Sequence, residues 1–128
     1  MSKIFDQPFK KIKPLTFYEI LRLRIDVFVV EQNCPYPELD GFDVDSGTRH
    51  IWLTDEESPV SYLRVLRKSK GVDKIGRVAT SLHNRNKGMA KSLIEHVINT
   101  TSGELVLDAQ AYLENWYEEM GFITNGKA

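Results

Sequence analysis

The stretch IGRVATSLHNRNKGMA, residues 75–90, decides the fold. Its first part, Ile75–Thr80, is an apolar run of strand length, and an amphipathic run, Met89–Asn99, follows a short polar segment. Apolar residues at 89, 93, 94, 97 and 98 recur with the spacing that places them on one face of an α-helix. The stretch therefore predicts a strand, a short loop and a helix in succession.

The loop of this unit has the composition of an anion cradle. Gly88 and Ala90 place no large side chain over the first amides of the predicted helix, and Arg85 and Lys87 add positive charge. The first N–H groups of a helix have no backbone partner, and the helix dipole makes the potential there positive. We therefore expect a pyrophosphate, and with it a nucleotide-type ligand, at this loop.

Hydrophobic periodicity predicts a first helix over 16–28, with Thr16 as its N-cap and Val27–Val30 at the point where the helix meets the core. Prolines and Asp/Gly clusters make 33–49 a long loop, and a loop of this length is usually functional. The other expected elements are strands at His50–Thr54, Val60–Leu66 and Glu104–Ala109, a helix at Ala111–Met120 capped by Gly121, and a strand that begins at Phe122.

These elements predict a mixed α/β fold in one domain, residues 1–128. The first two strands after the long loop form an antiparallel hairpin. The strand–helix–strand unit from 75 to 109 requires a crossover, so its two strands are parallel. We therefore expect a mixed central sheet with helices on both faces.

Composition narrows the class of protein. The chain has 128 residues and a formal net charge of −1, so no broad basic field attracts nucleic acid or an anionic membrane. Its single cysteine, Cys34, excludes an intrachain disulfide, and no stretch has the length of a signal-peptide core or a membrane span. One cysteine and three scattered histidines do not form a zinc ligand set. We expect a cytoplasmic protein without a metal.

Three signatures, in this order along the chain, resemble the GNAT superfamily of N-acetyltransferases, and the first and third resemble its ElaA-like branch. They are the string RIDVFVVEQNCPY (24–36) followed by Glu38-Leu39-Asp40, the phosphate loop Arg85-x-x-Gly88-x-Ala90, and the segment AQAYLENWYEEMGF (109–122). The loop departs from the usual pattern at Asn86, where the superfamily has glycine, and asparagine tolerates the left-handed conformation. The superfamily continues with two final strands, so a last strand is expected to be missing here.

The resemblance implies acetyl transfer from acetyl-CoA to an amine. It predicts that the strand backbone at Val78 and Thr80 pairs with the pantetheine arm, that one amide of this strand polarises the thioester carbonyl, and that Asn115 contacts the arm. It also places the pyrophosphate on the loop residues Arg85, Asn86, Lys87, Gly88, Met89 and Ala90.

The resemblance places Tyr117 near the CoA sulfur, where a phenol can protonate the departing thiolate, so Tyr117 is the expected general acid; an aromatic residue that packs beside Trp116 is the alternative. Glu31 is the expected base, with a capping or salt-bridging carboxylate as the alternative; Asp108, His50 and a water chain remain open. The family usually transfers directly, which disfavours an acyl intermediate on Cys34.

The acidic residues of the long loop have two interpretations. They either attract a cationic amine or form a solvated loop with Asx turns at Gly41 and Gly47; the residues are Glu38, Asp40, Asp43 and Asp45. The expected partner is a small-molecule or peptide amine, with a homodimer as a further possibility. The alternative function is a degenerate acyl-CoA-binding module.

Overall fold

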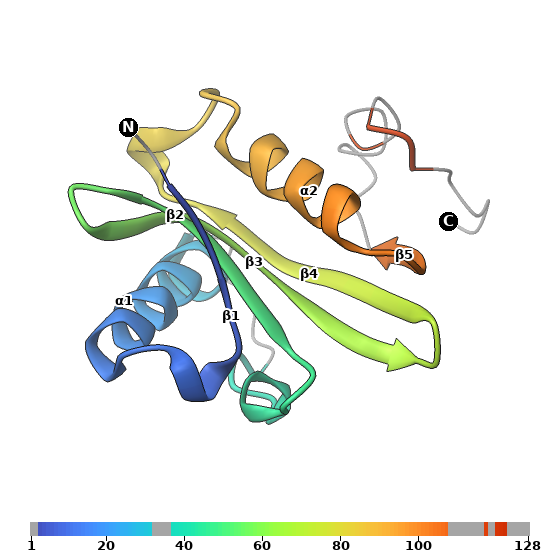
Figure 1. The fold of residues 1–128 in the computed structure, drawn as a ribbon. Coiled ribbons are helices and arrows are strands. Elements are labelled where there is room, and N and C mark those ends of the chain that lie inside the picture. The colour runs from blue at the N-terminus through green and yellow to red at the C-terminus, as the bar shows by residue number, and fades with distance from the viewer. Residues whose placement is uncertain (1–2, 32–36, 108–116, 118–119, 123–128) are drawn as a thin grey trace.

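The computed structural model describes residues 3–31, 37–107, 117 and 120–122. Within them a five-stranded sheet has the order β1-β2-β3-β4-β5, which is also the order along the chain. Neighbouring strands from β1 to β4 are antiparallel, and β5 is parallel to β4, so the predicted mixed sheet is confirmed (Figure 1). The strands are β1 (Ile4–Gln7), β2 (Arg49–Asp55), β3 (Ser58–Ser69), β4 (Val72–Thr80) and β5 (Glu104–Leu107).

Helices α1 (Pro14–Ile25) and α2 (Met89–Thr100) lie on opposite faces of the sheet (Figure 1). A π-helical segment, η2 (Asp26–Glu31), continues α1. Short 3-10 turns complete the described elements: η1 (Phe9–Lys11), η3 (Phe42–Val44) and η4 (Leu82–Asn84).

Two apolar cores follow from the alternation of side chains along the central strands. On the α2 face, Leu93, Ile94 and Val97 pack against alternate residues of the sheet, among them Ile51, Leu53, Leu63, Val65 and Ile75. On the α1 face, Ile20, Leu23 and Val27 pack against Trp52, Tyr62 and Ala79. Residues 59–65 of β3 are buried on both faces, as expected for the central strand of a sheet covered on both sides.

A bulge interrupts the pairing of β3 with β4. Tyr62 pairs with Ala79 and Arg64 with Gly76, so two residues of β4, Arg77 and Val78, oppose one residue of β3. Arg77 has φ +53°, the left-handed conformation that side chains other than glycine rarely adopt. Because of the extra residue, Ile75 and Val78 both contact the α2 core although they are three positions apart.

The parallel pairing of β4 with β5 can be followed, in the described residues, as far as the position next to this bulge. Its last pair is Ile75 with Leu107. Beyond the bulge, no strand among the described residues pairs with the outer edge of β4 at Val78–Thr80. This edge is the backbone that the sequence assigns to the pantetheine arm.

The structure corrects three expectations. The first helix begins at Pro14 after Lys13, so Thr16 is not its N-cap, and the α-helix ends at Ile25. Of the segment Val27–Val30 only Val27 is buried, and Val30 is 71% exposed. Strand β1 was not anticipated, because four residues before a proline carry too weak a pattern.

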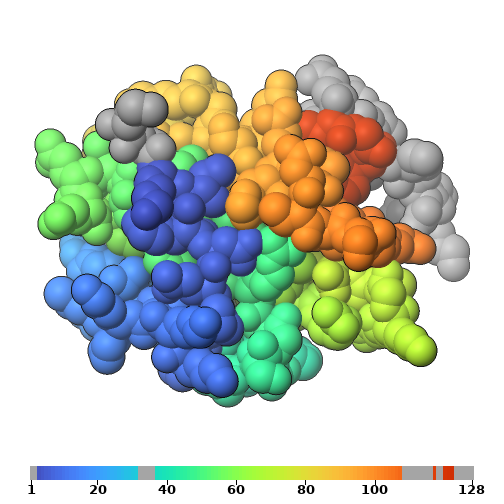
Figure 2. All heavy atoms as spheres, in the orientation of Figure 1, coloured from blue at the N-terminus to red at the C-terminus, as the bar shows by residue number. Residues whose placement is uncertain are grey.

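The C-terminal expectations fall mainly on residues outside the described set. The helix Ala111–Met120 is described only at Tyr117, which is helical, and at Met120. The predicted glycine cap is confirmed: Gly121 has φ +102°, and the Phe122 amide donates to the Tyr117 carbonyl at 3.4 Å. These residues lie directly against α2 (Figure 2).

Candidate active site

The loop between β4 and α2 has the geometry of an anion cradle. Asn86 (φ +64°) and Gly88 (φ +75°) are both left-handed. The first helical bond runs from the Ser92 amide to the Gly88 carbonyl at 3.0 Å, so the amides of residues 89–91 precede it, and no side chain of the described residues caps them. A Cβ built on Gly88 meets no described atom within 4 Å, which leaves the approach to these amides open.

Arg85 of this loop holds a carboxylate. Its Nε donates to the Thr80 carbonyl at 3.0 Å, which fixes the guanidinium beside the end of β4. Its Nη1 and Nη2 each donate to one carboxylate oxygen of Glu31 at 2.5 Å. Two parallel N–H···O bonds are also the way arginine binds a phosphate. Glu31 therefore occupies donors that the sequence assigns to the pyrophosphate.

Glu31 is correspondingly a poor match for the predicted base. The hydrogen bonds from Arg85 lower the pKa of its carboxyl, and a lower pKa weakens a proton acceptor. The geometry is that of the salt-bridging alternative. A catalytic role for Glu31 stays a prediction.

Tyr117 lies in the apolar core under α2. Its side chain is 7% exposed and belongs to the same cluster as Val78 of β4 and Met89 of the phosphate loop. Its ring meets Phe122 edge-on, with 6.3 Å between ring centroids. The structure thus brings together three of the predicted site residues from three separate segments.

The structure describes only some of the other predicted site residues. Asn115, Asp108 and Cys34 lie outside the described residues. Lys87 is exposed, and Ala90, the small residue of the motif, lies in the first turn of α2.

His50 is a buried structural residue in this fold. Its Nε2 lies 2.9 Å from the Asp43 carbonyl, so this nitrogen carries the proton, and its Nδ1 accepts from the Tyr62 hydroxyl at 2.7 Å. Burial lowers the pKa of the imidazole. Both ring nitrogens are engaged, which leaves His50 no geometry for acting through water.

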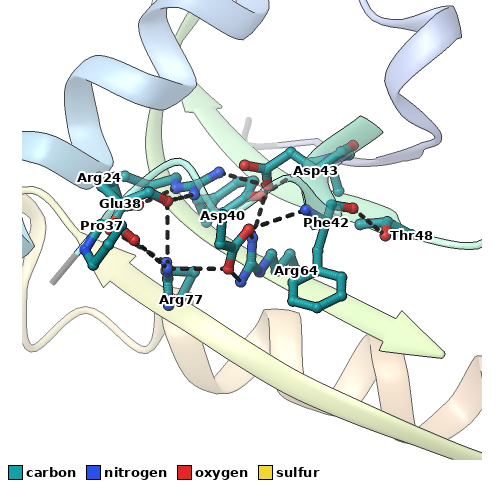
Figure 3. A network of polar contacts seen from close by, with 11 residues as sticks. Arg24, Pro37, Glu38, Asp40, Phe42, Asp43, Thr48, Arg64 and Arg77 are labelled. Carbon is teal, nitrogen blue, oxygen red and sulfur yellow. Dashed lines mark hydrogen bonds and ion pairs between the residues drawn. The ribbon is translucent and has the colours of Figure 1, made fainter. Parts of the chain in front are cut away.

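Three carboxylates of the acidic loop, Glu38, Asp40 and Asp43, are engaged in ion pairs, and attraction of a cationic amine by this loop stays a prediction. With three arginines these carboxylates form a closed ring of alternating charge (Figure 3). Its order is Arg24–Glu38–Arg77–Asp40–Arg64–Asp43 and back to Arg24. We call these six residues the ion-pair ring. The Asx turn expected at Gly41 is confirmed, since Asp40 Oδ1 accepts from the Phe42 amide at 3.1 Å.

On the buried side of the ion-pair ring each carboxylate faces an arginine, although the Nε atoms of Arg64 and Arg77 are buried without a hydrogen-bond partner among the described residues. Arg24 is 0% exposed and donates to Glu38 Oε2 at 2.5 Å and Asp43 Oδ1 at 2.8 Å. Burial raises the pKa of Asp43, but the bonds from Arg24 and Arg64 outweigh it and the net shift is downward. The bond from Arg64 lowers the pKa of Asp40 to about 2. Asp40 and Asp43 are therefore charged near neutral pH, and removing Arg24 or Arg64 would leave a buried carboxylate without its partner.

The sequence contains one signal for this ring. Arg24 stands at a core-facing position of the first helix, between Ile20 and Phe28, and an acidic run follows in the next loop. A charge at a core position requires a partner of opposite sign. The contributions of Arg64 and Arg77 depend on strand register and had no comparable signal.

Two further classes of site are absent from the described part of the chain. No helix there is both long and apolar enough to cross a membrane. No group of three or more His, Cys, Asp or Glu side chains there could hold a metal ion.

The fold and the cradle define a class of acyltransferase, and comparisons with known proteins agree. Residues 25–128 match the model of the acetyltransferase (GNAT) domain, so the chain belongs to this family. Protein ElaA of Escherichia coli is 39% identical over 115 residues, covering 83% of this chain and 74% of ElaA. A UPF0039 protein of Mycobacterium tuberculosis is 39% identical over 122 residues, covering 91% of this chain and 78% of that protein.

Solved structures show the same likeness. The crystal structure of Escherichia coli ElaA superposes with a TM-score of 0.92 at 33% identity, covering 99% of this chain and 90% of that one. An acyl-CoA N-acyltransferase from Pseudomonas aeruginosa superposes with a TM-score of 0.91 at 30% identity, covering 99% and 92%. The resemblance to the ElaA-like branch is therefore confirmed.

Acidification should destabilise the protein through His50. Since its folded pKa lies below the unfolded value of about 6.5, the unfolded chain takes up a proton that the native state does not. The stability is present above pH 6.5 and is lost as the pH falls. Urea unfolding at pH 7.5 and 5.5 should show a larger loss in the wild type than in His50→Gln, by up to about 1 kcal/mol. His83→Gln, at an exposed histidine, is the matched control; equal losses in wild type and His50→Gln would contradict the assignment.

Glu31→Gln should bind pyrophosphate more tightly than the wild type does. The amide releases Arg85 from a competing anion, so calorimetric titration with inorganic pyrophosphate and with CoA should show a several-fold gain in affinity. Glu19→Gln on α1 makes the same change in net charge away from the loop. An unchanged affinity, accompanied by a loss of turnover, would instead support the role of Glu31 as the base.

Proposed function

We propose that the protein transfers the acetyl group of acetyl-CoA directly to a primary amine. The start of α2 carries this proposal: Gly88 is left-handed, no described side chain caps the amides of residues 89–91, and no described atom lies within 4 Å of a Cβ built on Gly88. These amides and the helix dipole suit a diphosphate. Membership of the acetyltransferase (GNAT) family supports CoA as the owner of that diphosphate.

The edge of β4 supports the second part of the assignment. At Val78–Thr80 the backbone beyond the bulge has no strand partner among the described residues on its outer side. An extended pantetheine arm would add to this edge as a strand does. Diphosphate and arm would then follow one line from the start of α2 along β4.

The reaction needs little further machinery. The amine nitrogen bonds to the thioester carbonyl carbon and gives up a proton, the C–S bond breaks, and the sulfur leaves as a thiolate that takes up a proton. An alkyl ammonium, with a pKa around 10, must first lose a proton to gain its lone pair. Tyr117 is the proposed donor to the sulfur, supported by its place in one cluster with Val78 and Met89.

Cytoplasmic location remains a prediction.

Tyr117→Phe tests the transferase directly. The ring is kept, so the core should fold, while the proton donor is lost and kcat should fall about 100-fold. Thiol release from acetyl-CoA is measured with a panel of primary amines, and CoA affinity should not change. Tyr18→Phe, at a tyrosine 64% exposed on α1, is the control. A wild type that binds CoA but releases no thiol with any amine would be the binding module instead.

Gly88→Val tests the cradle. Valine opposes the φ of +75° and covers the amides, so CoA should bind about tenfold more weakly or worse by calorimetry. Gly71→Val is matched for backbone strain, because Gly71 has φ +77° and equally open space in the turn between β3 and β4. If both variants bind CoA as the wild type does, the cradle is wrongly assigned.

A further inference from the structure

Arg77 belongs to both the ion-pair ring and the bulge of β4. Its Nη2 lies 3.3 Å from Asp40 Oδ2, 3.3 Å from the Glu38 carbonyl and 3.4 Å from the Pro37 carbonyl. Its Nε lies 3.2 Å from Glu38 Oε1. The close view shows Arg77 facing Glu38 and Asp40 from β4 (Figure 3). One side chain thus connects the acidic loop to the strand edge that would hold the cofactor.

The loop does not need Arg77 as an anchor. Arg24 and Arg64, which are 0% and 3% exposed, already bind all three carboxylates of the loop. The contacts of Arg77 are longer, and its side chain is 26% exposed. Anchoring the loop therefore does not account for this residue.

The side-chain contacts of Arg77 bear on the conformation of its own backbone. A left-handed φ of +53° is unfavourable for arginine and persists only where the surroundings hold it. Gly76, which has no such φ, precedes it, so the strain falls on the arginine itself. The ion pairs of Glu38 and Asp40 with the guanidinium are contacts that can hold Arg77 in this conformation.

The conformation of Arg77 sets the direction of the next amide. Residue 77 and residue 78 share one peptide plane, so rotation about the Arg77 backbone turns the Val78 N–H. Val78 begins the part of β4 beyond the bulge, whose outer edge has no strand partner among the described residues. An amide there can stabilise charge on a thioester oxygen only if its direction is fixed in advance.

We propose that Arg77 is a positioning residue for acyl transfer: held by Glu38 and Asp40, it keeps the β4 bulge in the conformation that aims the Val78 amide at the thioester carbonyl. The inference rests on the proposed function and extends it to a residue that touches neither substrate. It also gives the acidic loop a part in the reaction, because the loop carries the two carboxylates that hold Arg77.

Arg77→Gly separates the side chain from the backbone. Glycine accepts φ +53° without strain, so the bulge can still form, but nothing holds it. We expect kcat for acetyl transfer to fall about tenfold or more, with the KM for acetyl-CoA and the urea midpoint near wild type. Arg77→Lys keeps one charge without the fork and should recover part of kcat. Arg67→Gln, which removes an exposed ion pair on β3, should leave kcat unchanged.

Hydrogen exchange of residues 76–79 gives a readout that does not depend on the amine. Faster exchange in Arg77→Gly than in the wild type and Arg67→Gln is expected if the guanidinium holds the bulge. Wild-type exchange in Arg77→Gly, or a wild-type kcat, overturns the inference while the transferase assignment stands. A wild type that neither binds CoA nor releases thiol with any amine of the panel overturns the proposed function itself.

Discussion

The extra residue in β4 is the constraint on which the arrangement of the site depends. Without it, Ile75 and Val78 would point to opposite faces, and the apolar core under α2 would lose one of them. The bulge also coincides with the last described pair between β4 and β5, Ile75 with Leu107. One inserted residue therefore preserves the core and turns Arg77 toward the acidic loop, and beyond it no strand of the described residues pairs with the outer edge of β4.

The ion-pair ring stabilises this geometry at a cost. Charged groups lose hydration when they are buried, and a buried pair is often no more stable than apolar residues of the same volume. The ring fixes the orientation of its members, because a guanidinium donates paired hydrogen bonds to a carboxylate only in its own plane. Arg24 and Arg64 hold the loop 37–48 in place on the α1 face. None of the apolar side chains of this loop belongs to the core. This loop carries Leu39, Phe42 and Val44 exposed to solvent.

Features that depend on residues close together in the chain were predicted from the sequence, and features that depend on distant residues were not. The cradle was predicted because Gly88, Asn86 and the start of α2 are neighbours in the chain, and their backbone preferences are local. The strands β2 to β5 were predicted from runs of apolar residues. The N-cap at Thr16 was wrong because Pro14 fits the first turn better, and the buried role of Arg24 was missed although its helical position indicated it.

The sequence by itself determined the order of helices and strands from α1 to β5, the mixed sheet and the glycine at the start of α2, since each follows from periodicity or from one residue's allowed dihedral angles. Only the tertiary structure decided which charges meet. Arg85 binds Glu31 across 54 positions, and Arg77 binds Asp40 across 37. The first pair depends on how the end of η2 packs beside the loop before α2, and the second on the bulge in β4, since a shift of one residue there would send Arg77 to the opposite face.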